Sequence, residues 1–254
     1  MIFTFDERPS DSPFVERIWR AHSVRAGSFI SVAASHWEMV VTRQDGQTFL
    51  TVRGPETKAT PLDCSADGEW LGIRFKLGTV MPHLPARNLV DGAVNLPDAG
   101  SRSFWLHCSA WQFPDFENAD TFVDRLVRDG LLVRTPVVQA ALQDQLKDLS
   151  LRTAQRHFLR TTGLTHSAVR QIERARYATT LLQQGLSILD VIYEAGYFDQ
   201  PHLTRSLKYY IGQTPAQIMD RSRAQQLSFL YKTAPLHSNY APAVDEGQSR
   251  ENSQ

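Results

Sequence analysis

Two short stretches of the sequence each gather long, hydrogen-bonding side chains within a few residues. The first stretch contributes Arg152, Gln155 and Arg156. The second contributes Gln200, His202, Thr204 and Arg205. Arginine and glutamine can form paired hydrogen bonds with the edges of guanine and adenine, and threonine suits phosphate oxygens. We interpret both sets as candidate DNA contacts; for any single residue the alternative is an ordinary solvated helix face.

Both stretches are predicted to be the second helix of a helix-turn-helix pair. The pairs read "VVQAALQDQLKDLSLRTAQRHFLRTTG" (137–163) and "ILDVIYEAGYFDQPHLTRSLKYYIG" (188–212), and a long helix over 166–185 connects them. The second helix of each pair keeps an apolar stripe opposite its polar side chains, Ala154 with Phe158 and Leu203 with Leu207. Burial of that stripe would hold the polar face rigid enough to enter a major groove.

Helix-capping residues mark the ends of these elements. Ser150 precedes the second helix of the first pair and Gly163 follows it, while Ser187 and Asp199 precede the two helices of the second pair. Thr214 is expected to start a further helix through "PAQIMDRSRAQQL". Serine, threonine and aspartate accept hydrogen bonds from the free N–H groups of a first helical turn, and glycine suits a left-handed helix end.

Residues from about 136 to 220 resemble the DNA-binding domain of AraC-type transcriptional regulators. The resemblance rests on Ser150, Ala154, Arg156, Phe158 and "TTG" in the first pair, "RARYATTLL" (174–182) in the connecting helix, and "AGYFDQPHLTRSLKYYIGQTP" (195–215) in the second pair. It implies that the seven residues named above occupy base-facing positions. It also implies an N-terminal partner domain of cupin-like β fold, which binds an effector or mediates dimerisation.

The first 110 residues carry strand and turn signals compatible with that partner. Asp45-Gly46 predicts a tight hairpin, residues 70–78 alternate apolar and polar side chains, and 100–113 is expected to add another strand. Short strands separated by glycine and proline favour a small barrel or sandwich. The sequence therefore predicts an α+β chain: a β-rich cupin-like domain, then an all-α domain with two helix-turn-helix units.

The expected division of the chain has four parts. They are a β-rich regulatory or effector-binding domain over 1–115, a linking helix within 116–134, the double helix-turn-helix domain over 135–231 and a disordered tail over 232–254. The charge distribution agrees with it. Residues 1–120 hold 11 basic and 15 acidic side chains (net −4), whereas 121–230 hold 14 basic and 9 acidic (net +5). The neutral total thus contains a basic segment suited to a polyanion.

The N-terminal half offers weaker candidates for a site. His36, Arg74 and His107 are possible polar groups of an effector pocket. The aromatic residues are expected to fill the core rather than line that pocket; they are Trp37, Trp70, Phe75, Phe104, Trp105 and Trp111. The alternative is a metal-dependent cupin-type enzyme fused to a DNA-binding domain. His36 and Glu38 would then share one strand face, with His83 or His107 as third ligand.

No enzyme, cofactor or metal is expected on the main interpretation. Its partners are double-stranded DNA, with a small-molecule effector, RNA polymerase and a second copy of the chain as further candidates. A helical adaptor that binds proteins through the same exposed faces is the other rival. Cys64 and Cys108 are too far apart for a zinc motif and are expected to be buried free thiols. No signal peptide or membrane span is evident, so a cytoplasmic location is expected.

Overall fold

The structure is a computed structural model that describes residues 2–135, 138, 140, 150–220 and 226–228. The first helix of the first predicted pair and the predicted tail over 232–254 lie outside the described residues. The strands are β1 Phe3–Arg8, β2 Val15–Ser23, β3 Gly27–Ser31, β4 Glu38–Gln44, β5 Gln47–Arg53, β6 Thr60–Cys64, β7 Glu69–Phe75, β8 Thr79–Val80, β9 Ala93–Asn95, β10 Asp98–Gly100, β11 Ser103–Leu106, β12 Ser109–Gln112 and β13 Val133–Arg134. The helices are η1 Ala86–Asn88, α1 Ala119–Arg128, α3 Leu151–Thr162, α4 His166–Gln183, α5 Ile188–Glu194, α6 Gln200–Tyr210 and α7 Pro215–Met219.

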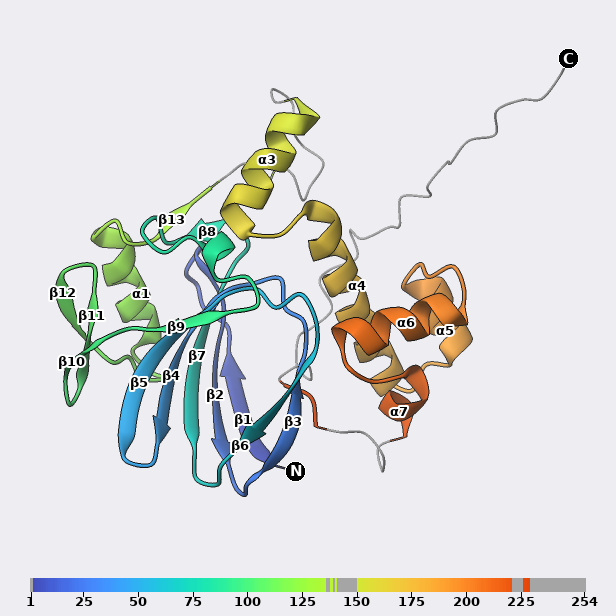
Figure 1. The fold of residues 1–254 in the computed structure, drawn as a ribbon, viewed down its shortest axis with the longest axis horizontal. Helices are drawn as coiled ribbons and strands as arrows, with labels where there is room; N and C mark the ends of the chain where they lie inside the picture. Colours follow the sequence, from blue (N-terminus) through green and yellow to red (C-terminus); the bar gives the residue numbers. More distant parts are fainter. Residues whose placement is uncertain (1, 136–137, 139, 141–149, 221–225, 229–254) are drawn as a thin grey trace, which may run out of the picture.

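A six-stranded antiparallel sheet forms the centre of the N-terminal half, in the order β1-β2-β7-β4-β5-β9 (Figure 1). The predicted hairpin joins β4 to β5, and Asp45 and Gly46 have the positive φ angles, 52° and 75°, that such a turn requires. The alternation in β7 buries Leu71, Ile73 and Phe75. The β-rich prediction is confirmed, whereas the cupin-like assignment stays a prediction.

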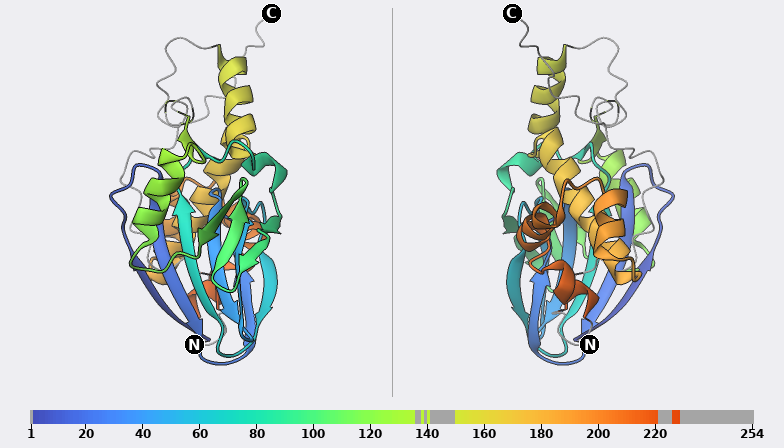
Figure 2. Two further views of the ribbon diagram at one scale, coloured as in Figure 1. Left: turned by 90° about the vertical axis from the view of Figure 1, so that its left-hand side faces the viewer. Right: turned by 90° about the vertical axis from the view of Figure 1, so that its right-hand side faces the viewer.

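Smaller elements cover this sheet. The segment 100–113 is not one strand, as expected, but the hairpin β11–β12, which also pairs with β10. The segment 116–134, predicted to hold a linking helix, contains the helix α1 over Ala119–Arg128, and Gly130 follows it with φ 71°. The apolar face of α1 packs with β11 and β12 against the main sheet (Figures 1 and 2).

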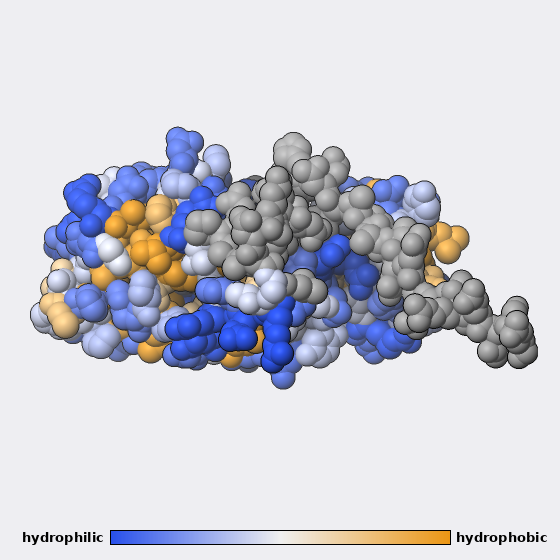
Figure 3. All heavy atoms as spheres, turned by 90° about the horizontal axis from the view of Figure 1, so that it is seen from above, coloured by the Kyte–Doolittle hydropathy of each residue, from blue (hydrophilic) through white to orange (hydrophobic). Residues whose placement is uncertain are grey.

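Most of the predicted aromatic core is confirmed. Trp37, Phe75, Phe104 and Trp111 are buried, whereas Trp105 is 47% exposed. Seen from above, hydrophobic surface gathers over the end of the molecule that carries α1 and β10–β12 (Figure 3). No helix of the described residues is long and apolar enough to cross a membrane.

The two cysteines differ from expectation. Both are free, but Cys64 is half-buried and Cys108 is exposed. Cys108 lies in the turn between β11 and β12, where it has a positive φ of 64°.

The C-terminal half is helical, and the predicted N-terminal caps of its helices are confirmed. The side chains of Ser150, Ser187, Asp199 and Thr214 each accept a hydrogen bond from a backbone N–H of the following first turn. The long helix α4 leads from α3 to the group α5–α7 (Figure 1). The last helix is shorter than predicted, because α7 ends at Met219.

The β3–β6 ribbon, the antiparallel pair of residues 27–31 and 60–64, joins the two halves. The backbone N–H groups of Ala33 and Ala59, which flank the ribbon, donate to the carbonyls of Tyr210 and Tyr209 at 2.8 and 2.9 Å. These carbonyls belong to the last turn of α6, where a helix leaves its acceptors unpaired. On the same side, Ile30 exchanges backbone hydrogen bonds with residues 226 and 228. The β-rich half therefore caps the last helix of the second helix-turn-helix pair.

A second contact between the two halves lies at the C-terminal end of α3. Gly163 has φ 79°, and a Cβ there would lie 2.9 Å from Arg87 Cα and 2.7 Å from Val90 Cγ2. The side chains of Phe158 and Ala33 share one buried cluster near this point. The first helix-turn-helix unit is thus completed in part by residues of the β-rich half.

Buried charges also cross this boundary. His36 Nε2 lies 3.0 Å from Glu16 Oε2, and Ser35 Oγ donates to Glu173 Oε1 of α4 at 2.5 Å. Arg176 of α4 donates to the carbonyl of Ala33 at 3.1 Å. These contacts place α4 against residues 33–36, the segment between β3 and β4.

Substitution of Gly163 by alanine should destabilise the protein more than the same change at Gly185. Both residues have left-handed φ angles, which cost alanine about 1–2 kcal/mol, but nothing lies within 4 Å of a Cβ at Gly185. We expect Gly163→Ala to lose at least about 1 kcal/mol more in urea unfolding, because displacing the η1 backbone adds to the φ strain. Equal losses for the two variants would contradict the described docking of α3.

The charge cluster predicts a pH-dependent contribution from Glu16. Burial raises the pKa of its carboxyl, but the positive charges of His36, Arg74, Arg176 and Arg17 together lower it by more. The net pKa of Glu16 therefore lies below the ordinary 4.5. Because the pKa is depressed in the folded state, the stabilisation is complete above about pH 4.5 and is lost as the pH falls through the folded-state pKa.

Urea unfolding of the wild type and of Glu16→Gln between pH 7 and pH 3 checks this. The wild type should be the more stable at pH 7, and the difference in free energy of unfolding should shrink below pH 4.5. A difference that stays constant over this range would show that Glu16 does not gain from the surrounding cations.

Candidate nucleic-acid interface

One face of helix α6 is buried, and the first turn of the helix is capped by an aspartate side chain. Leu203 and Leu207 are fully buried against α4 and α5. Asp199 Oδ1 accepts the backbone N–H of His202 at 2.7 Å, and Pro201 occupies the first turn, where a missing N–H costs little. The apolar side of the helix therefore fixes the direction of the polar side.

All four predicted residues of α6 reach the surface. Gln200 and Arg205 are exposed, and His202 and Thr204 are partly exposed. Lys208, one turn beyond Thr204, is exposed as well and was missed by the sequence analysis, although its spacing placed it on this face. The surface of α6 away from its buried leucines thus offers cationic and amide donors together.

The environment of His202 favours its neutral form. Burial lowers the pKa of the imidazole, Arg174 and Arg205 lower it further, and Asp199 opposes them. The ring packs edge-on against Tyr197 with 5.1 Å between centroids. At neutral pH His202 is therefore suited to donate and accept hydrogen bonds, as base edges require, rather than to act as a cation toward phosphate.

The turn before α6 is fixed by α4. Gly196 has φ 65°, and the Arg174 guanidinium lies 4.5 Å over the Tyr197 ring. The Tyr197 hydroxyl in turn lies 3.0 Å from Ser206 Oγ of α6. These contacts set the angle between α5 and α6, while Phe198, 90% exposed, points out of the turn beside the cap.

Helix α3 repeats this design. Ala154 and Phe158 are buried, and the predicted residues Arg152, Gln155 and Arg156 are exposed. Arg160 continues the exposed row one turn later and was also missed by the sequence analysis. In the described residues, α3 and α6 are thus two capped helices with buried apolar stripes and exposed cationic faces, connected through α4.

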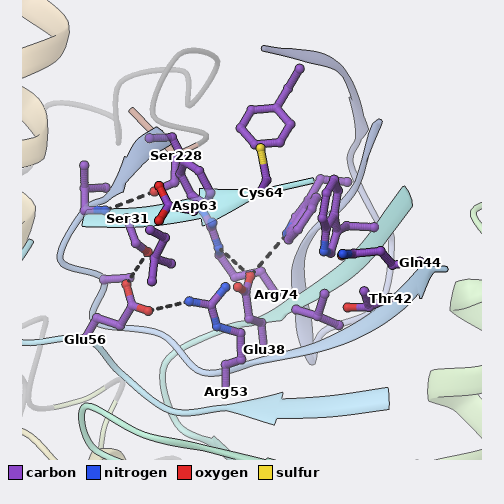
Figure 4. Close-up of a pocket in the computed structure, with 18 of the residues that line it drawn as sticks. Ser31, Glu38, Thr42, Gln44, Arg53, Glu56, Asp63, Cys64, Arg74 and Ser228 are labelled. Atoms are coloured by element: carbon purple, nitrogen blue, oxygen red, sulfur yellow. Dashed lines mark hydrogen bonds and ion pairs between the residues drawn. The ribbon is translucent and has the colours of Figure 1, made fainter. Parts of the chain in front are cut away.

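The predicted effector residues are only partly brought together. His36 and Arg74 both line a cavity of about 590 Å³ between the main sheet, the β3–β6 ribbon and α4 (Figure 4). His107 does not line this cavity. It lies in the turn between β11 and β12, and its ring stacks on that of His83 with 4.2 Å between the ring centroids. Trp70, expected to pack in the core, is half-buried: it packs against the small cluster of Trp19, Ala21 and Val40 and also lines this cavity.

His36 and Glu38, the candidate metal ligands of the enzyme alternative, have other partners in the structure. His36 pairs with Glu16, and Glu38 accepts the Trp19 indole N–H at 3.2 Å. Among the described residues, no group of three or more histidine, cysteine or carboxylate side chains could hold a metal ion. The two-residue spacing of His36 and Glu38 therefore does not correspond to a metal site in the described part of the chain.

Comparisons with known proteins match this geometry. A family described as a helix-turn-helix domain matches residues 147–221. The transcriptional regulator RipA of Corynebacterium glutamicum is 34% identical over 168 residues, which cover 59% of this chain and 49% of that protein. RipA of Corynebacterium diphtheriae is 36% identical over 83 residues, which cover 33% of this chain and 24% of that protein. The chain thus spans about half or less of the length of these relatives.

A solved structure of ToxT from Vibrio cholerae covers 86% of this chain and 98% of its own, with 9% identity and a TM-score of 0.36. The matched residues contain both capped helices and the connecting α4. The helical half of this chain is therefore similar to a helix-turn-helix domain, and the chain is similar to the transcriptional regulator RipA.

Proposed function

We propose that this chain is a sequence-specific DNA-binding transcriptional regulator. The observation that carries the proposal is the pair of helices α3 and α6, each capped, buried along an apolar stripe and exposed along a cationic face. Arg152, Gln155 and Arg156 of α3 and Gln200, His202, Thr204 and Arg205 of α6 would contact bases and the adjacent backbone. The two helices would enter successive major grooves on one face of the DNA, about one helical turn apart.

The remaining parts of the chain would control this activity. In our proposal, residues 1–115 form the regulatory domain, 116–134 contain the linking helix α1, and 135–231 form the DNA-binding domain. The hydrogen bonds of Ala33 and Ala59 with α6 and of Ala33 with Arg176 of α4 would give the regulatory domain a direct route to the DNA-binding helices. We propose a small-molecule effector as its ligand and a cytoplasmic location; contacts with RNA polymerase and with a second copy of the chain are compatible with this function.

Arg205 tests the assignment of α6. Replacing Arg205 by alanine should weaken binding to a cognate fragment by about 1–3 kcal/mol if the guanidinium makes a bidentate base contact. The fragment is selected from genomic DNA with the full chain, and affinity is measured by fluorescence anisotropy. Arg128→Ala is the matched control, because Arg128 is an exposed arginine of α1, away from both helices.

The outcome separates the proposal from its rival. Weaker binding to the cognate fragment, with a smaller loss on unrelated DNA, supports base reading by Arg205. Equal affinities for wild type, Arg205→Ala and Arg128→Ala would remove Arg205 from the interface. A chain that retains no genomic fragment at low salt would favour the protein-binding adaptor.

A further inference from the structure

The two outer edges of the β3–β6 ribbon are built differently. Ile30 of β3 faces Pro61 of β6, and the N–H of Ile30 points away from β6. Facing residues of an antiparallel pair turn their polar backbone groups either both inward or both outward, so the nitrogen of Pro61 lies on the outer edge of β6. Proline offers no N–H there, and no strand among the described residues pairs with that edge. The β6 edge is therefore closed to a further strand, whereas the β3 edge presents a donor and an acceptor to one.

Residues 226–228, beyond the last helix of the C-terminal half, pair with the β3 edge in parallel orientation. The N–H of Ile30 donates to the carbonyl of Gln226 at 2.9 Å, and the N–H of Ser228 donates to the carbonyl of Ile30 at 2.6 Å. The N–H of Val32 donates to Ser228 Oγ at 3.0 Å (Figure 4). The segment 226–228 thus satisfies the outward backbone groups of Ile30 and the N–H of Val32.

Side chains of the segment 226–228 add to this pairing. Leu227 is 3% exposed and lies in the same buried cluster as Leu203 and Leu207, the residues that anchor α6. The Oε1 atom of Gln226 accepts the N–H of Ile2 at 2.6 Å. Main-chain hydrogen bonds along an edge, together with a buried side chain, are the contacts by which sheet edges bind extended peptides.

We propose that the segment 226–228 is a clasp, whose pairing with the β3 edge of the same chain holds α6 in the position that base reading requires. The segment follows α7, which ends at Met219, whereas β3 belongs to the β-rich half. The clasp therefore ties the far end of the helical half to the β-rich half. Its positioning role rests on the proposed DNA-binding function, whereas the docking of the segment does not.

The clasp acts on α6 and not on α3. Ser228 holds Val32, and the next residue, Ala33, donates to the last turn of α6. Helix α3 meets the β-rich half elsewhere, where Gly163 lies close to Arg87. Release of the clasp would therefore change the position of α6 relative to α3. Two helices that enter successive major grooves need a fixed spacing, whereas contacts of one helix with phosphates do not.

Amide hydrogen exchange of the full chain, followed by NMR, tests the docking. Leu227→Asn places an amide in an apolar cluster and should release the segment, so the N–H groups of Ile30 and Val32 should exchange at least about tenfold faster. Leu189→Asn is the matched control, because Leu189 of α5 is 74% exposed, and it should change neither rate. Protection of the β4 and β7 amides verifies the fold. Unchanged protection of Ile30 and Val32 in Leu227→Asn would overturn the clasp.

Two changes at Ser228 test the backbone pairing without altering a buried apolar side chain. Ser228→Ala removes the oxygen that accepts from Val32, so Val32 should exchange faster while Ile30 stays protected. Ser228→Pro also removes the N–H that donates to the Ile30 carbonyl and should expose both amides, which decides the question if Leu227→Asn does not fold. Ile30 protected equally in the two variants would contradict the pairing.

Protein concentration distinguishes the chain's own segment from that of a second copy. With a clasp inside one chain, the exchange rates of Ile30 and Val32 should stay constant over a roughly twentyfold range of concentration. Protection that grows with concentration would assign the paired strand to a second copy and overturn the clasp.

DNA affinity tests the positioning role separately. Leu227→Asn should weaken binding to the cognate fragment at least about fivefold and leave binding to unrelated DNA unchanged, whereas Leu189→Asn should change neither. Because neither substitution changes a charge, a loss does not reflect altered electrostatics. Faster exchange of Ile30 with unchanged cognate affinity would overturn the positioning role and leave the strand docking standing. A wild-type chain that protects Ile30 and binds no DNA would refute the proposed function alone.

Discussion

The hydrogen bonds from Ala33 and Ala59 to the last carbonyls of α6 set the relation between the two halves of the molecule. A helix ends with unpaired carbonyls, and burying them without donors is costly. Here the donors come from segments that flank the β3–β6 ribbon, 150 or more residues earlier in the chain. Leu207 still pairs with the N–H groups of Ile211 and Gly212, so the end of the second helix-turn-helix unit is closed jointly by its own residues and by the β-rich half.

This constraint affects every other feature of the helical half. A side chain at Gly212 would be strained, since its φ is 84° and a Cβ would lie 3.0 Å from Ile30 Cγ2 and 3.2 Å from Ala59 Cβ. Helix α4 is fixed between the same strands and α6 by Arg176 and Glu173. The exposed faces of α3 and α6 are consequently oriented by the β-rich half as well as by the packing among the helices.

The sequence predicted the parts whose signals are local. The second helix-turn-helix unit was predicted well because Ser187, Gly196, Asp199 and Gly212 fall at its ends, and each has a direct backbone role in the structure. The β11–β12 turn was missed because it is formed by His107 and Cys108, which hold positive φ angles without the glycine or asparagine that usually signals such a turn. His36 and Arg74 were named as pocket residues, but the position of Arg176 in the same cavity was missed, because it depends on contacts between distant segments, which leave no periodic pattern in one sequence.

The central claim is that α3 and α6 read DNA together. Hydroxyl-radical footprinting of a selected genomic fragment with the full chain tests it most directly. The account predicts two protected clusters on one face of the duplex, separated by about 10 base pairs, with an affinity that falls steeply as salt rises. A single protected cluster, or protection that is independent of salt, would contradict it.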